Sequence, residues 1–152
     1  MKIEIDQSGK IEHTNRKTII AFSNSNNGAI VISGNDKKTV QRYFRSIGKP
    51  RLFIYVAFVA LIYLLIKDHV KNGDQVIVDR EYPGYESFIR KSLKNLVQKL
   101  SGKDVTVSIW QIGKKSTAHD LAWKELKMRV QNLAKRVTYD KVIAVIKKSG
   151  NI

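Results

Sequence analysis

Cysteine is absent from the 152 residues of this chain, and several kinds of protein are excluded with it. A chain without thiols forms no disulfide scaffold, no thiolate zinc site and no thiol nucleophile. Proline occurs only at Pro50 and Pro83, and no Pro-, Ser- or Gly-rich linker divides the chain. The length suits one domain. We therefore expect a single domain over residues 1–147, followed by a flexible C-terminal tail over 148–152.

Acidic residues are also scarce. The chain has 13 Asp and Glu against 28 Lys and Arg, which gives a formal net charge of +15. Such a surplus on a small domain predicts attraction to polyanions, since it disfavours the compact state unless a partner neutralises it. Nucleic acid is the commonest intracellular polyanion, and acidic lipid is its competitor. The hydrophobic fraction of 43% can fill a core, which excludes general disorder. The first residues contain no apolar leader, so we expect a cytoplasmic protein.

Short apolar runs predict the strands. Residues 2–6 alternate between polar and apolar side chains, and two further runs follow at 18–23 and 29–33, separated by turn-forming residues. Three strands joined by short connections indicate an antiparallel meander. Later strands are expected over 75–79 and 105–112, with an optional peripheral strand over 142–146.

Helical spacing and capping residues predict the helices. They are expected over 36–47, from 52 to about 71, over 85–100, and from Ser116 to about Val137. After the meander, strands alternate with helices, as parallel crossover connections require. The predicted fold is therefore α/β: a three-layer fold with a mixed five-stranded sheet, its first three strands antiparallel, flanked by helices.

One long segment carries no charge. Residues 52–66 span roughly 22 Å as a helix, which is short of the ~30 Å hydrocarbon core of a bilayer. A buried helix is therefore preferred to a membrane span. A membrane-associated protein remains the alternative, because Lys and Arg flank this segment.

Two acids close predicted strands. Asp6 ends the first strand and Asp79 ends the fourth. Strand ends of a helix-covered sheet are where such folds bind ligands. Two nearby carboxylates repel one another, and a divalent cation such as Mg²⁺ or Mn²⁺ relieves that repulsion. The alternative is that both residues only cap turns.

A third candidate region precedes the last long helix. Lys114 and Lys115 stand just before Ser116, a plausible N-cap, and helix N-termini attract anions. His119 and Asp120 follow in the first turn, from which either side chain could reach a cleft at the strand ends. The alternatives are a core histidine and a first-turn acid that only favours the helix dipole.

In this order along the chain, Asp6, Asp79 and the segment 118–122 (Ala-His-Asp-Leu-Ala) resemble the RNase H-like superfamily, closest to its Holliday-junction resolvase branch. In that branch, acids on the first strand and at the end of the fourth hold metal. Further acids on the last helix, often near a Lys or His, complete the site. The resemblance covers roughly residues 1–137. Segments 78–84 and 113–116 are also similar to motifs of small archaeal or archaeal-virus proteins of this type.

The resemblance implies two-metal hydrolysis of phosphodiester bonds with Mg²⁺ or Mn²⁺. Asp6 would bridge the metals, Asp79 and Asp120 would each hold one, and His119 would assist proton transfer or bind phosphate. This chain departs from the pattern at Lys124, which stands where a second acid of the last helix is expected. Glu81 or Glu12 could replace that acid.

The implied partner is nucleic acid, with DNA favoured over RNA and no membrane. The residues expected to contact it are Lys114, Lys115, Ser116, Arg80, Arg90 and Lys124. Three aromatic residues, Tyr82, Tyr85 and Trp110, either stack on bases or belong to the core.

Because resolvases act as dimers, a homodimer is a further expectation, with the helices at 52–66 and 85–100 as candidate surfaces. The sequence thus leads to two hypotheses. One is a metal-dependent nuclease acting on structured or branched nucleic acid. The other is a non-catalytic nucleic-acid-binding module on the same scaffold.

Overall fold

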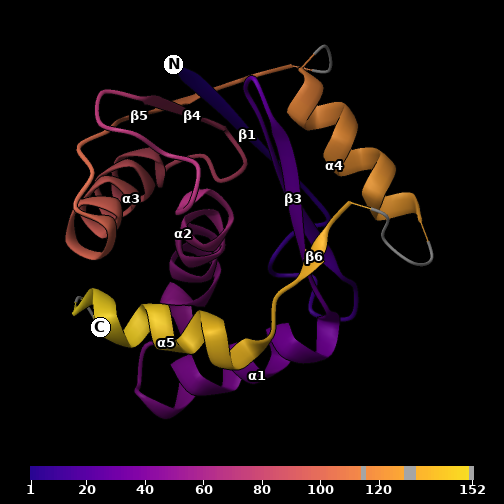
Figure 1. Cartoon of the computed structure of the whole chain (residues 1–152). Helices are drawn as coiled ribbons and strands as arrows, with labels where there is room; N and C mark the ends of the chain where they lie inside the picture. Colours follow the sequence, from indigo (N-terminus) through magenta and orange to yellow (C-terminus); the bar gives the residue numbers. More distant parts are fainter. Residues whose placement is uncertain (114–115, 129–132, 151–152) are drawn as a thin grey trace.

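The computed structural model describes residues 1–113, 116–128 and 133–150. These residues form an α/β fold with a mixed six-stranded sheet and five α-helices (Figure 1). The strands are β1 (Lys2–Ser8), β2 (Thr18–Ser23), β3 (Asn27–Ile32), β4 (Gln75–Asp79), β5 (Thr106–Trp110) and β6 (Lys135–Arg136). The helices are α1 (Gly34–Ser46), α2 (Phe53–Ile66), α3 (Glu86–Ser101), α4 (Thr117–Lys127) and α5 (Tyr139–Ser149), and a short 3₁₀ turn, η1 (Pro50–Leu52), precedes α2.

The sheet has the strand order β5-β4-β1-β2-β3-β6. Strands β1, β2 and β3 are antiparallel, which confirms the predicted meander. Strands β4 and β5 run parallel to β1, and β6 runs parallel to β3. The sheet thus has six strands where five were expected, because the short strand β6 adds to the edge of β3. The parallel pairing of β1 with β4 brings the C-terminal ends of these two strands together.

Helices cover the sheet on both faces. Figure 1 shows α4 on one side and α1, α2, α3 and α5 on the other. Along β2, Ile20 and Phe22 join the larger core under α2, whereas Ile19 and Ala21 join a smaller cluster under α4. All six residues of β2 are buried, which explains why this strand shows an apolar run rather than a polar–apolar alternation.

Helix α2 lies at the centre of the larger core. It packs against α3, α5, β2 and β3 and is apolar around its whole circumference, as is typical of a helix that other elements largely enclose. The structure confirms the predicted buried helix, although it ends at Ile66 rather than near Lys71. None of the described helices combines the length and apolar character needed to cross a membrane.

The connection from β1 to β2 is held by a buried lysine. Lys37 of α1 donates hydrogen bonds from Nζ to the carbonyl oxygens of Lys10 (3.1 Å) and His13 (2.8 Å) and to Oγ1 of Thr18 (2.9 Å). Burial lowers the pKa of this ammonium group to about 8, against an opposing effect of the charge on Glu12. The three acceptors compensate for removing the lysine side chain from water.

The structure corrects the predictions for the C-terminal third. The helix expected from Ser116 to about Val137 ends at Lys127, and Met128 already has an extended backbone. Further along, the N–H of Val137 donates to the carbonyl oxygen of Val31 at 2.9 Å. Pairing with the otherwise open edge of β3 satisfies backbone groups there that a continued helix would leave unpaired.

The peripheral strand expected over residues 142–146 is wrong, because these residues form the middle of α5. Val142, Val145 and Ile146 are buried at helical spacing, and a short apolar run of this kind fits either element from sequence alone. Lys148 was expected in the flexible tail but also belongs to α5. Residues 151–152 of that tail lie outside the described part of the chain.

Replacing Ile62 with Ala should destabilise the protein strongly. Ile62 lies in α2 with 0% of its surface exposed, so truncation leaves a cavity and costs about 2–5 kcal/mol of unfolding free energy. The matched control is Leu64→Ala in the same helix, at a position that is only partly buried. Urea unfolding followed by circular dichroism measures both. An equal loss in the two variants would contradict the deeper burial of Ile62 relative to Leu64.

Candidate metal centre

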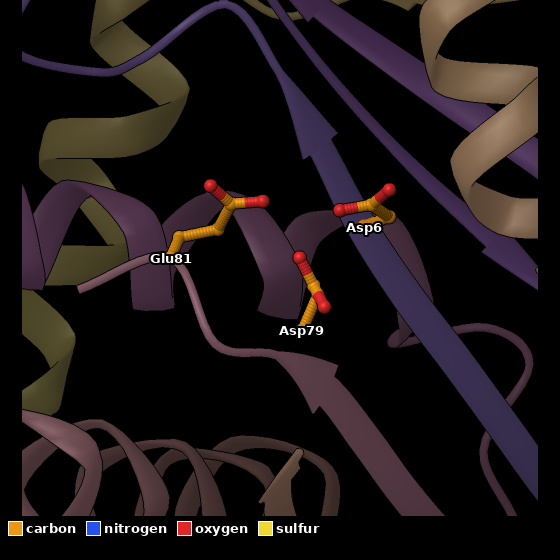
Figure 2. Close-up of side chains that lie close together, drawn as sticks. All are labelled: Asp6, Asp79 and Glu81. Atoms are coloured by element: carbon orange, nitrogen blue, oxygen red, sulfur yellow. The ribbon is translucent and has the colours of Figure 1, made fainter. Parts of the chain in front are cut away.

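Three acidic side chains converge where β1 and β4 end. Asp6, Asp79 and Glu81 each offer a carboxylate oxygen, and the three oxygens lie within 4.8 Å of one another (Figure 2). Ile5 is paired with Val78 in the parallel register, which places the next residues, Asp6 and Asp79, side by side. Glu81 follows two residues after Asp79, and Figure 2 shows its carboxylate turned toward the other two.

Main-chain donors and a histidine fix two of these carboxylates. Asp6, only 2% exposed, accepts a hydrogen bond from the N–H of Gln7 at 2.8 Å, and its Oδ2 lies 2.7 Å from Nδ1 of His119. Oδ1 of Asp79 accepts a hydrogen bond from the N–H of Ile112, also at 2.8 Å. Among the described residues, the cluster thus consists of carboxylates held by main-chain donors and a histidine.

Burial and mutual repulsion shift the pKa values of two acids upward. The pKa of Glu81 rises to about 9, first because of burial and then because its carboxyl group shares hydrogen bonds with Asp79 and Asp6. The pKa of Asp6 is also raised, by burial and then by the charge on Asp79, against hydrogen bonds that act in the opposite direction. At neutral pH a proton on Glu81 therefore relieves the repulsion in the cluster. A divalent cation can replace that proton.

His119 lies where the sequence placed an accessory residue. It belongs to the first turn of α4, and its side chain is 37% exposed. Its contact with Asp6 fixes the orientation of the ring, as carboxylates commonly do for histidines beside metal sites. The ring therefore connects the buried end of the cluster with the surface.

Asp120, predicted as the third metal ligand, is not part of the cluster. Its side chain is 57% exposed and forms an ion pair with Lys124, one helical turn later, at 2.9 Å. Successive helical side chains differ by about 100° in direction. Because His119 faces β1, its neighbour Asp120 is turned away. The structure thus brings Asp6 and Asp79 together as expected and adds Glu81 in place of Asp120.

The residues predicted to contact nucleic acid are dispersed. Ser116 is buried and caps α4, where its hydroxyl accepts a hydrogen bond from the N–H of Ala118. Half of the Arg80 side chain is exposed, and its Nε lies 3.7 Å from a carboxylate oxygen of Glu86. Arg90 is exposed on α3. Lys124 pairs with Asp120, and the pair Lys114 and Lys115 lies outside the described residues.

Tyr82 is a core residue that positions the cluster, a role the sequence did not reveal. Its hydroxyl accepts a hydrogen bond from Nε2 of Gln7 at 2.9 Å, and the N–H of Ile11 lies 3.3 Å away. The same hydroxyl donates to Oε1 of Glu12, which is thereby held at Tyr82 rather than in the acidic cluster. These contacts tie the segment that carries Glu81 to β1. From sequence alone, a tyrosine that follows the end of a strand does not indicate such a hydrogen-bond network.

Comparison of the chain with family models, with curated proteins and with solved structures finds no match. The three acidic side chains themselves therefore indicate which metal the site can bind. Three carboxylates are the hard oxygen donors that Mg²⁺ and Mn²⁺ prefer. Asp79 and Glu81 are only partly buried, so the cluster is accessible from their side.

Replacing Glu81 with Gln should flatten the dependence of stability on pH. In the wild type, folding raises the pKa of this acid from about 4.5 to about 9. Its contribution to stability is therefore greatest below pH 4.5 and is lost as the pH rises to 9. Each pKa unit corresponds to roughly 1.4 kcal/mol, so the stability of Glu81→Gln relative to the wild type should rise with pH between these limits and reach up to about 3 kcal/mol at pH 7. Urea unfolding at several pH values without divalent cations measures this gain.

The exposed acid Asp120 offers a matched control. Asp120→Asn should leave the slope of stability against pH as it is in the wild type. Parallel curves for the wild type and Glu81→Gln would show that the three acids do not share a proton.

Proposed function

We propose that this protein is a metal-dependent nuclease that hydrolyses phosphodiester bonds in structured or branched nucleic acid. The observation that carries the proposal is the convergence of Asp6, Asp79 and Glu81 on one point. Asp6 lies on β1 and Asp79 ends β4, and the resemblance to the RNase H-like superfamily implies that acids on the first strand and at the end of the fourth hold metal. The mixed sheet, with three antiparallel strands followed by parallel ones, is consistent with that resemblance.

Mg²⁺ or Mn²⁺ bound here would supply charge stabilisation and an activated water. Asp6, held by the N–H of Gln7 and by His119, would be the buried ligand. Asp79, held by the N–H of Ile112, and Glu81 would complete the set on the open side. Because Glu81 is protonated near neutral pH, it would release its proton as the cation binds.

His119 is the candidate for proton transfer. Its Nδ1 lies against Asp6, so the hydrogen-bonded tautomer carries a hydrogen on Nδ1 and leaves Nε2 to accept a proton. The ring is partly exposed, and this second nitrogen can therefore exchange protons with solvent or substrate.

The charge balance supports a nucleic-acid substrate. A net charge of +15 attracts phosphate groups, whereas the acidic cluster alone would repel them. The combination favours a metal-bridged contact at the cluster and cationic contacts around it.

A non-catalytic nucleic-acid-binding module is the second candidate function. It is favoured by the last helix of the proposed site, since α4 contributes a histidine to the cluster and turns its acid, Asp120, toward Lys124. Such a module would bind with the same dependence on salt but would not need a divalent cation.

A cleavage assay distinguishes the two functions. Labelled four-way junction, RNA–DNA hybrid and plain duplex are incubated with and without Mg²⁺ or Mn²⁺. We expect cation-dependent cleavage of the junction or hybrid. We also expect Asp6→Asn to lower the rate by at least about 100-fold, the upper range for losing a group that only supports a metal ligand. The matched control is Asp120→Asn, which should cleave like the wild type.

A thermal-shift assay separates metal binding from catalysis. Mg²⁺ or Mn²⁺ should raise the unfolding temperature of the wild type and of Asp120→Asn but not that of Asp6→Asn. Binding of nucleic acid without cleavage in all three proteins would establish the binding module instead. Equal inactivation by Asp6→Asn and Asp120→Asn would contradict the placement of Glu81, rather than Asp120, in the site.

A further inference from the structure

An exposed tryptophan stands beside the acidic cluster. Trp110 ends β5, and in the parallel register it is paired with Asp79, so the two side chains lie on the same face of the sheet. The indole is 63% exposed. The N–H of Arg80 donates to the carbonyl oxygen of Trp110 at 2.9 Å, which fixes the end of β5 against the segment that leads to Glu81.

Two other exposed aromatic rings, those of Tyr85 and Trp123, have partners. Tyr85 stacks on Tyr55 with ring centroids 3.7 Å apart, and Nζ of Lys127 lies 3.6 Å from the ring centroid of Trp123. Within the described part of the chain, Trp110 has no such ring or cation partner. A large apolar surface is thus left open to solvent one strand away from the proposed metal site.

Trp110 also closes one end of a shallow depression in the sheet. Helix α4 packs on β1, β2 and β3, and the depression lies over the neighbouring part of the same face, on β1, β4 and β5. Its floor includes Gln75, Ile77, Thr106 and Ser108, which we call, together with Trp110, the Trp110 surface. On the β1 side the depression is also lined by Lys2 and Glu4, which carry opposite charges. The five side chains of the Trp110 surface are uncharged and offer hydrogen bonds and flat apolar contact, which suit nucleobases better than phosphates.

We infer that the Trp110 surface binds unpaired nucleotides that flank the scissile phosphate, with one base stacked on the indole. This inference rests on the proposed nuclease function and names its substrate class. The +15 charge of the chain favours a polyanion as the occupant, and the paired positions of Asp79 and Trp110 join this surface to the cluster. Bases inside a duplex do not present their faces, so the stacking selects single strands, loops or opened junctions.

The two tryptophans of the chain allow a direct test by fluorescence. Trp123→Phe leaves Trp110 as the sole tryptophan, and the matched variant Trp110→Phe leaves Trp123. Each is titrated in EDTA with a single-stranded oligonucleotide and with the same sequence as a blunt duplex. We expect the single strand to quench Trp110 and not Trp123. We also expect Trp110→Ala to weaken single-strand binding by roughly 5- to 150-fold, the range for the loss of one base–aromatic stack.

Three results would overturn the inference. The first is equal quenching of Trp110 by duplex and single strand, and the second is quenching confined to Trp123. The third is an indole already shielded from acrylamide in a free protein that sediments as a dimer, because a second copy would then cover the surface.

The nuclease proposal is tested separately by adding Asp6→Asn to the Trp123→Phe protein. Quenching by the single strand should persist in this variant while cleavage is lost. Quenching in a protein that never cleaves, with or without divalent cation, would reject the nuclease and keep the base-binding surface. Cleavage without quenching would reject the base-binding surface and keep the nuclease.

Discussion

The burial of most of α2 is the constraint on which the arrangement of the other elements depends. A helix with no charged residue and no polar face is stable in water only if neighbouring elements cover most of its surface. The sheet covers one side, and α3 and α5 cover others. The paired strands β1 and β4 are thereby held against a rigid core, with their C-terminal ends at its margin.

The rigid core keeps the three acidic side chains close together despite the repulsion between their carboxylates. Asp6 and Asp79 are fixed by main-chain donors, and Tyr82 ties the segment carrying Glu81 to β1. The raised pKa of Glu81 means that a proton on this residue reduces the repulsion among the three acids at neutral pH. Such a site costs stability in the fold and is typical of positions that serve a function rather than structure.

On the open face of the sheet, the acidic cluster and an exposed indole ring lie side by side. The paired residues Asp79 and Trp110 belong to neighbouring strands, so the carboxylates suited to a cation stand next to an indole suited to a base. The cationic surplus of the chain acts over longer distances and carries no sequence information. Under the proposed function, such a domain would attract any nucleic acid and engage those that expose a base near the scissile bond.

Much of the fold was determined by local patterns in the sequence. The apolar runs of β2 and α2, the meander and the acids Asp6 and Asp79 at strand ends could all be predicted, because period and position specify them within a few residues. Only the tertiary structure decided that Glu81, rather than Asp120, completes the cluster. The rotation of α4 about its axis relative to β1 sets which side chain faces the site, and one residue changes that direction by about 100°. Packing against neighbouring elements likewise decided that residues 142–146 form a helix, and pairing with β3 decided the strand β6, since short segments fit more than one element until their partners are in place.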